Sequence, residues 1–396
     1  MHDGPPTLDG WVRVLHASRE PLAKLVDAGE RIYWPMLAVS LVLAVAWLVR
    51  TAQRRRGALA TGPASVVAAG LRAAVDRRIW AHPSAWLDYK LLFAKALLRA
   101  LLLPAWAVST LGLTVAVVGW LDALDGTHRV TALSPAVIVG LYTVVLFVTW
   151  DLSRYLLHRA MHRVSWLWAF HQVHHSARVL TPFTLYRSHP VEAWLFGLRG
   201  AVVTALVTGG FFHVFGRQAV QLEILGVNAL GFCFNLAGGN LRHSHVRLSF
   251  GPLERVFISP AQHQIHHGMH PLDQNTNYGT WLAIWDRIGG SLRLADSSRL
   301  RRFGLAQHEA NHAPDGLLSA LIGPFAAVTR QMASGLRAAA TSRRAALTSV
   351  LVLLPTAALA DQSLASVTPP SAPPTSPART PSLASPTYRA HATPPP

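Results

Sequence analysis

Apolar stretches of transmembrane length recur along the first 160 residues of the chain. The first extends from Tyr33 to Val49, YWPMLAVSLVLAVAWLV, and contains no charged residue. Its 17 residues would form a helix roughly 25 Å long, because each helical residue rises about 1.5 Å. Two further runs cover Leu101 to Leu121 and Pro135 to Leu157. Since the hydrocarbon core of a bilayer is about 30 Å thick, these three runs predict transmembrane helices.

Basic residues gather at one end of each run, and a chain that crosses the bilayer three times places those ends on the same side. They are Arg50, Arg54, Arg55 and Arg56 after the first run, Lys90, Lys95 and Arg99 before the second, and Arg154, Arg159 and Arg163 in or after the third. Lys and Arg near the ends of transmembrane helices favour the cytoplasmic side. We therefore expect an external N-terminus and a third helix that ends at the cytoplasmic face.

Two more apolar runs, Val191 to Phe212 and Ala219 to Ala237, predict a helical hairpin that leaves and returns on the cytoplasmic side. Arg199 and Glu223 lie inside these runs, and ionised groups at mid-bilayer are costly, so a re-entrant or shallow hairpin is an equal alternative. The pattern predicts an all-α integral membrane protein. It would have about four to five transmembrane or re-entrant helices and a cytoplasmic, histidine-rich helical cap.

The same pattern divides the chain into five expected segments. They are an N-terminal extramembrane segment (1–32), N-terminal transmembrane helices with a connecting segment (33–130), a histidine-rich domain (131–296), a C-terminal extension (297–344) and a low-complexity tail (345–396). The first thirty residues lack the basic and then apolar order of a signal peptide. Beyond Ala360 the chain is mostly Pro, Ser, Thr and Ala without an apolar period, which is typical of disorder.

Composition agrees with a membrane protein. Of 396 residues, 51% are hydrophobic and 14% are charged, against about 25% charged in soluble domains. The formal net charge is +17, and the bases adjoin apolar runs, so they indicate anionic lipid headgroups as partners and not nucleic acid. Cys233 is the only cysteine, which excludes a disulfide within the chain and a cysteine-based metal site.

Histidine carries the candidate chemistry. The chain has 20 histidines, and 12 of them lie between His158 and His267. Three motifs hold eight of these: HxxxH at His158 and His162, HxxHH at His171, His174 and His175, and HxxHH at His263, His266 and His267. Residues at i, i+3 and i+4 share one helix face, so each motif would present two or three imidazoles to one point.

Eight imidazoles exceed the needs of one ion and suit two transition-metal ions, each with an open position for oxygen. Imidazole binds iron, copper, zinc and nickel, so the ligand type does not select the metal. A single HxxxH motif would more simply be explained by surface or core histidines without metal. Three motifs at helical spacing in apolar, aromatic-rich sequence favour a metal site.

The motifs resemble those of the sterol desaturase and fatty acid hydroxylase superfamily, and the resemblance covers roughly residues 130 to 295. Besides the three histidine motifs, it rests on Asp151-Leu-Ser-Arg-Tyr-Leu-Leu-His158-Arg, Tyr186-Arg-Ser-His189-Pro-Val-Glu192, Leu241-Arg-His243-Ser-His245-Val-Arg-Leu, and Asn277-Tyr-Gly279 followed by Trp285-Asp286-Arg287 and Gly289. Members similar to alkylglycerol monooxygenase look like near relatives. The resemblance makes residues 131–296 a fatty acid hydroxylase-like catalytic domain.

The resemblance implies a non-haem centre of two Fe ions, with O2 as co-substrate and a lipid carbon as the target of hydroxylation or desaturation. Its metal ligands would be His158, His162, His171, His174, His175, His243, His263, His266 and His267. His189 matches a histidine that some relatives lack, so a supporting or substrate-lining role is expected more than ligation. His245 stands where relatives often have asparagine and is not expected to bind metal.

Two carboxylates and the electron supply complete the expectations. Asp151, two helical turns before His158, could accept a proton from a ligand imidazole or be a capping residue, and Asp286 could equally fix a helix end. No dinucleotide fingerprint, haem pattern or cysteine cluster is present, so electrons would come from an external donor, a ferredoxin or cytochrome b5-like protein.

We expect a multi-pass oxidoreductase of a bacterial inner membrane whose histidine motifs face the cytoplasm. Two alternatives stay open: a membrane metal-binding or metal-transport protein without oxygenase activity, and a degenerate family member that acts as a binding scaffold.

Overall fold

The computed structural model describes residues 8–56, 63–106, 108–126, 132–219, 223–224, 227–295, 302–306, 309, 311 and 313–363. The chain forms two units, Met1–Met332 and Ala333–Pro396. Most described residues are helical, which confirms the predicted fold class in its coarse form. Within the described residues, the strands form a two-stranded antiparallel ribbon of β1 (Glu223–Ile224) and β2 (Val227–Asn228).

Twelve α-helices of the described chain lie wholly in the first unit. They are α1 (Leu8–Ala23), α2 (Trp34–Arg56), α3 (Pro63–Ala74), α4 (Arg77–Trp80), α5 (Pro83–Trp106), α6 (Thr110–Asp125), α7 (Pro135–Arg163), α8 (Ser165–His175), α9 (Pro190–Phe215), α10 (Ala229–Leu236), α11 (Pro260–His266) and α12 (Ile284–Ile288). Four 3-10 helices connect them: η1 (Pro182–Tyr186), η2 (Gly216–Gln218), η3 (Gly239–His243) and η4 (Gly251–Arg255). Helix α13 (Leu317–Ser363) begins in the first unit and continues into the second.

Three helical segments are long and apolar enough to cross a membrane: Trp34–Gln53, Pro135–Arg163 and Pro190–Gln218. They coincide with the first and third predicted spans and with the first arm of the predicted hairpin. Large apolar side chains on these and neighbouring helices point outward, among them Val42, Val144 and Leu206. An apolar outer surface of this kind suits lipid better than water.

The run from Leu101 to Leu121 forms parts of two helices and not the single span that was predicted. Helix α5 ends at Trp106, and α6 begins at Thr110. The Ser109 hydroxyl accepts a hydrogen bond of 3.1 Å from the Gly112 amide and so caps the start of α6. Hydropathy alone does not detect a helix break inside an apolar run.

The second arm of the predicted hairpin is also not a long helix. Residues 219–237 contain the β1–β2 ribbon and the short helix α10, which the Asn228 side chain caps. Helix α9 alone has transmembrane length, and its charged residue turns toward α7: Arg199 donates hydrogen bonds to the Trp150 carbonyl and the Ser153 hydroxyl. An intramembrane arginine satisfied by a neighbouring helix is consistent with a spanning α9.

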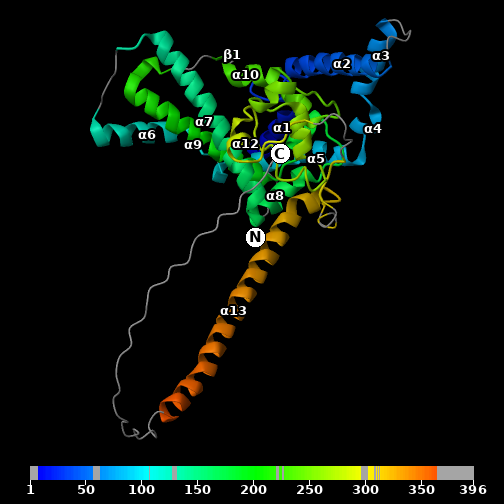
Figure 1. The fold of residues 1–396 in the computed structure, drawn as a ribbon. Coiled ribbons are helices and arrows are strands. Elements are labelled where there is room, and N and C mark those ends of the chain that lie inside the picture. The colour runs from blue at the N-terminus through cyan, green and yellow to red at the C-terminus, as the bar shows by residue number, and fades with distance from the viewer. Residues whose placement is uncertain are drawn as a thin grey trace, which may run out of the picture. The chain divides into compact units, whose positions relative to one another are not determined.

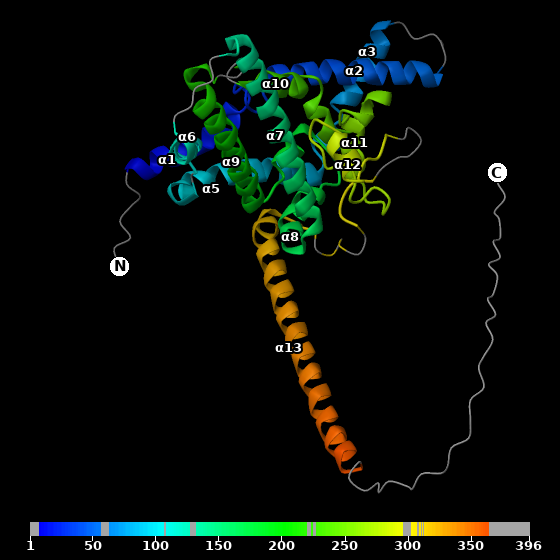
Figure 2. The same ribbon diagram turned by 60° about the vertical axis from the view of Figure 1, so that its left-hand side comes forward.

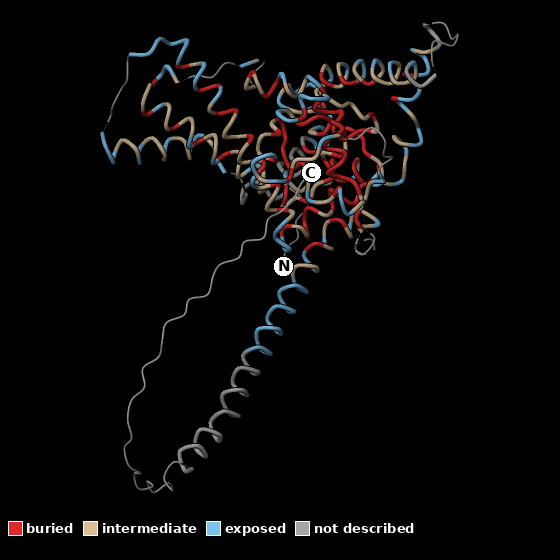
Figure 3. Tube along the Cα trace, viewed as in Figure 1, coloured by how far each residue is buried: buried red, intermediate tan, exposed pale blue. Residues whose placement is uncertain are grey.

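Helix α9 packs between α6 and α7, and Figures 1 and 2 show the three running beside one another on one side of the first unit. Gly209 permits the close approach of α6, because a β-carbon there would lie 2.6 Å from Val117 Cγ1. Buried residues gather in the middle of this unit, whereas α2 and α6 are mostly intermediate or exposed (Figure 3). The polar core formed by α8, α11 and the loops around them therefore adjoins the apolar helices.

The boundary predicted at residue 345 lies within α13, which continues to Ser363. Alanine and leucine are frequent in this stretch, and both favour helix. The remainder of the predicted low-complexity tail, residues 364–396, lies outside the described residues.

Candidate metal centre

Helical spacing places the histidines of each motif on one face, but the prediction that each motif serves one point is wrong for both HxxHH motifs, whose histidines divide between two groups. His158 and His162 occupy the last turns of α7, and the HxxHH motif from His171 to His175 ends α8. The third motif lies on α11, with His267 as its C-cap residue, and His243 ends η3. The Ser259 hydroxyl and the Gln262 side chain form a reciprocal capping box at the start of α11, which fixes where that short helix begins.

The structure brings all nine predicted ligands together, in two groups that share no residue. The first group, called the five-histidine group, consists of His158, His162, His171, His175 and His266. The second, called the four-histidine group, consists of His174, His243, His263 and His267. In each group the candidate ligand atoms all lie within 4.8 Å of one another.

The distances between imidazole nitrogens fit metal coordination. Nε2 of His158 lies 3.2 Å from Nε2 of His171 in the five-histidine group. In the other group, His243 Nε2 lies 3.2 Å from His174 Nε2 and 3.0 Å from His263 Nε2. Two ligands about 2.1 Å from one ion are about 3.0 Å apart at a right angle and about 3.4 Å apart at a tetrahedral angle. The observed separations fall in this interval.

Hydrogen bonding alone satisfies this arrangement poorly. His243 Nε2 contacts two other Nε2 atoms, and His263 Nε2 also contacts that of His267 at 3.3 Å. A neutral imidazole nitrogen has either one proton or one in-plane lone pair, so such a chain needs shared donors and acceptors. In the five-histidine group, Nε2 of His162, His175 and His266 is buried with no hydrogen-bond partner. Buried nitrogens without partners are costly, and a metal ion at each group would satisfy them.

The opposite ring nitrogens of three ligands donate to oxygens. His158 Nδ1 donates to the Tyr278 carbonyl at 2.7 Å, and His266 Nδ1 donates to the Thr276 carbonyl at 2.7 Å. His171 Nδ1 donates to Glu192 Oε1 at 2.9 Å. These bonds place the proton on Nδ1 and leave the Nε2 lone pair directed into the group, which is the usual support of a metal-bound imidazole.

Glu192 is the carboxylate that sequence reasoning did not assign. It lies in the first turn of α9, twenty-one residues after His171, within the segment that carries the family resemblance. Its side chain is buried, and it contacts His171 through space. Only the position of the glutamate after the His189-Pro pair could have suggested it.

Asp151 and Asp286 do not contact a ligand imidazole. Asp151 accepts hydrogen bonds from the amides of Trp281 and Leu282 and from Trp285 Nε1. Of the two roles left open for Asp151, direct support of a ligand imidazole is therefore not the one it has in the structure. Its carboxylate instead ties α7 to the loop after Gly279.

Asp286 acts on the same loop from the other side. It accepts from the amides of Tyr278 and Gly279 and from the Ser291 hydroxyl. The loop carries the Tyr278 carbonyl that accepts from His158, so Asp286 positions that ligand indirectly.

His189 and His245 lie outside both groups. His189 Nδ1 accepts from the Val191 amide and caps α9, and its Nε2 donates to the Leu321 carbonyl. His245 Nε2 contacts the Ala73 carbonyl. His189 thus caps a helix and contacts no ligand imidazole, so its expected supporting or substrate-lining role stays a prediction. The exclusion of His245 agrees with its position.

Burial favours the neutral form of six of the candidate ligands. It lowers the pKa of His174 and of His266 to about 3, and neighbouring imidazoles contribute in the same direction. The same two causes hold the pKa of four further ligands well below 6.5: His175, His243, His263 and His267. Neutral imidazole is the form that binds metal, so both groups are ready for ions at neutral pH.

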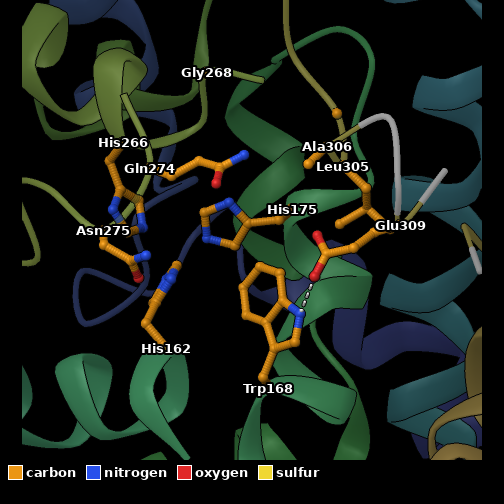
Figure 4. Close-up of a pocket in the computed structure, with 11 residues that line it drawn as sticks. His162, Trp168, His175, His266, Gly268, Gln274, Asn275, Leu305, Ala306 and Glu309 are labelled. Atoms are coloured by element: carbon orange, nitrogen blue, oxygen red, sulfur yellow. Dashed lines mark hydrogen bonds between the residues drawn. The ribbon is translucent and has the colours of Figure 1, made fainter. Parts of the chain in front are cut away.

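Two cavities adjoin the histidine groups, and a third cavity adjoins one of these two. The first, called the Trp168 cavity, has a volume of about 260 Å3, and His162, His175 and His266 project toward one another along its wall (Figure 4). Opposite them, Trp168 Nε1 donates to Glu309 Oε1 at 2.9 Å.

The second, called the inner cavity, has a volume of about 160 Å3 and is lined by histidines of both groups and by Glu192. Arg31, Arg154 and Arg242 also line it. The third, called the apolar cavity, measures about 750 Å3 and shares Arg154, Ala193 and Phe196 with the inner cavity.

Comparison with known proteins agrees with this geometry. Residues 143–291 match the family model described as Fatty acid hydroxylase. An alkylglycerol monooxygenase of Danio rerio is 30% identical over 145 residues, which are 37% of this chain and 29% of that protein. Ornithine lipid hydroxylase OlsE of Rhizobium tropici is 29% identical over 175 residues, 44% of this chain and 47% of that protein. A Delta(7)-sterol 5(6)-desaturase of Eremothecium gossypii is 32% identical over 146 residues, 37% of this chain and 36% of that protein.

Residues 143–291 are thus a fatty acid hydroxylase domain, and the predicted resemblance to the sterol desaturase and fatty acid hydroxylase superfamily is confirmed. The relatives are lipid-modifying oxidoreductases by name. The aligned part spans between 29% and 47% of their length. No solved structure shows a significant match to the chain.

Proposed function

We propose that this chain is a membrane-bound di-iron oxygenase that uses O2 and external electrons to hydroxylate or desaturate a C–H bond of a lipid. The observation that carries the proposal is the division of nine buried histidines into two groups with coordination-like spacing. Five and four imidazoles would each hold one ion. The choice of iron follows the family resemblance, because imidazole accepts several metals.

Bound iron would supply the activation of O2 that no side chain provides. In hydroxylation, one oxygen atom of O2 would be inserted into a C–H bond of the lipid, whose hydrogen becomes the hydroxyl hydrogen. The other oxygen atom would leave as water after uptake of two electrons and two protons. Desaturation takes two hydrogens from adjacent carbons and, with the same two electrons and two protons, releases two waters. A ferredoxin or cytochrome b5-like donor at the basic cytoplasmic face would supply the electrons.

The chain's own residues prepare this chemistry. Glu192 and the Tyr278 carbonyl fix the orientation of His171 and His158. The walls of the inner cavity bring a substrate carbon close to histidines of both groups. The relatives include a monooxygenase, a hydroxylase and a desaturase by name, so the proposal spans both reactions.

Metal analysis of the full chain purified in detergent tests the proposal. We expect two irons per chain by inductively coupled plasma mass spectrometry. The double variant His174→Ala and His266→Ala removes one ligand from each group and should lose most of the iron. His245→Ala, outside both groups, is the matched control and should retain both ions.

Zinc alone, or full iron retention in the double variant, would contradict the di-iron centre and favour a metal-binding or metal-transport protein. The substrate needs a separate experiment: lipid profiling of a deletion strain would identify the lipid that is modified. An intact lipid profile in that strain would count against lipid oxidation even if iron is present.

A further inference from the structure

Three arginines meet at the inner cavity without a carboxylate partner. The arginine ion pairs of the described chain use Arg99, Arg187 and Arg293, and none uses Arg31, Arg154 or Arg242.

The surroundings of the three differ. Arg242 is 4% exposed and directly precedes His243. Arg154 Nε donates to the Thr280 hydroxyl, and its guanidinium lies 4.5 Å from the centre of the Phe196 ring. Arg31 is half-buried beside them.

The carboxylates near this cavity are already used. Asp151 accepts three hydrogen bonds from the loop after Gly279, and Glu192 Oε1 accepts from His171. Glu192 Oε2 has no hydrogen-bond partner. Asp151 also acts electrostatically on the three arginines, so two carboxylates stand against three guanidinium groups. Two bound metal ions would add more positive charge at the same place.

Neighbouring buried guanidinium groups destabilise the protein by mutual repulsion unless an anion binds between them. Desolvated charges that lack a partner cost several kcal/mol each in protein interiors. Burial, followed by the nearby Arg242 and Arg154, lowers the pKa of Arg31 well below its ordinary value. Planar guanidinium groups bind phosphate and carboxylate through paired hydrogen bonds, so an anionic group would relieve this repulsion.

The apolar cavity supplies the second half of the site. It continues from the inner cavity through the shared residues Arg154, Ala193 and Phe196. Leu98, Trp194 and other apolar side chains make up most of the lining of its volume of about 750 Å3. The charged side chains that also line it are Glu30, Lys95, Arg99, Arg154 and Arg199. Its wall includes residues of α9, a helix of transmembrane length.

We infer that Arg31, Arg154 and Arg242 bind the anionic headgroup of an amphiphilic substrate, whose hydrocarbon chain occupies the apolar cavity. This assignment rests on the proposed function and names its substrate class. The inner cavity is small, about 160 Å3, and the three arginines share it with histidines of both groups. The carbon that is oxidised, with the electron balance given above, therefore lies within a few bonds of the headgroup.

Equilibrium binding to the metal-free full chain in dodecyl maltoside tests the headgroup site without any turnover. The probes are tritiated hexadecyl phosphate and tritiated hexadecanol, with inorganic phosphate as competitor. Arg242→Gln and Arg31→Gln should each weaken hexadecyl phosphate at least tenfold and change hexadecanol less than twofold. Arg255→Gln, an exposed arginine on η4, is the matched control and should change neither.

If the arginine variants lose affinity for both probes equally, or lose no affinity for hexadecyl phosphate, the assignment is overturned. Inorganic phosphate that binds as tightly as hexadecyl phosphate would show a site for free anions and would also overturn it. If Arg242→Gln aggregates in size-exclusion chromatography, Arg31→Gln decides, because the Arg31 guanidinium has no hydrogen bond to the described residues. Binding to metal-free protein succeeds or fails independently of iron content, so it separates this inference from the proposed oxygenase.

Discussion

The contact between Glu192 and His171 gives the sharpest prediction for the metal centre. Among the five-histidine group, His171 is the ligand that donates to a carboxylate: its Nδ1 lies 2.9 Å from Glu192 Oε1, and Glu192 is 4% exposed. We expect Glu192→Ala to weaken metal binding at that group. Removal of such a supporting partner typically costs 10–100-fold in affinity, or about 1.4–2.8 kcal/mol.

The amide variant Glu192→Gln should lie near the tenfold end of this range. Its oxygen can still accept from His171 Nδ1, and its nitrogen can occupy the position of Oε2, which has no partner. The change is then mainly the loss of negative charge, which makes the imidazole less basic toward metal.

Iron retention against a graded chelator series measures the effect on full-length protein in detergent. We expect the two irons to be released in two steps. In Glu192→Ala, only the release from the five-histidine group should shift to lower chelator concentration. Glu254→Gln is the matched control, because this buried glutamate accepts from the Ser249 and Ser259 hydroxyls and contacts no histidine. Unchanged release in Glu192→Ala, or the same shift in the control, would refute the reasoning.

Three further predictions concern the loop, the helix packing and pH. Asp286→Asn should cost about 1–3 kcal/mol of stability from its buried hydrogen bonds and lower iron retention through the displaced Tyr278 carbonyl; unchanged melting and iron content would contradict this. Gly209→Val should destabilise by about 1–3 kcal/mol through a clash with Val117, whereas Gly210→Val, with no atom within 4 Å of its β-carbon, should not; equal melting temperatures would contradict it. Metal-free protein should lose stability as pH falls from 6.5 toward 3. In this range the histidines of the unfolded chain bind protons, whereas buried His174 and His266, with pKa values of about 3, stay unprotonated in the folded state. A flat melting temperature between pH 8 and pH 5 would contradict this.

Local spacing predicted the parts of the site that depend on local structure. The i, i+3 and i+4 positions fixed the helical faces of the three motifs, and all nine predicted ligands meet in space. Their division into groups depends on how α8 and α11 face each other, which spacing does not encode. His174 and His171 lie on one face yet belong to different groups.

Other errors have equally physical causes. Asp151 and His158 share a helix face, but two turns separate them by about 10 Å along the axis, too far for contact. Glu192 reaches His171 through tertiary packing of α9, which sequence distance conceals. The break at Ser109 arises from a local cap inside an apolar run. The cytoplasmic orientation stays a prediction.

The two HxxHH motifs exchange roles between the groups. Helix α8 gives His171 and His175 to the five-histidine group and His174 to the other, whereas α11 gives His266 to the five-histidine group and His263, with His267, to the other. Each helix therefore bridges both groups over a single turn. The separation of two bound ions would be set by helix pitch, and any step that changes it must move α8 and α11 as rigid bodies. Insertion of one residue in either motif would rotate a ligand by about 100° and disable both ions at once.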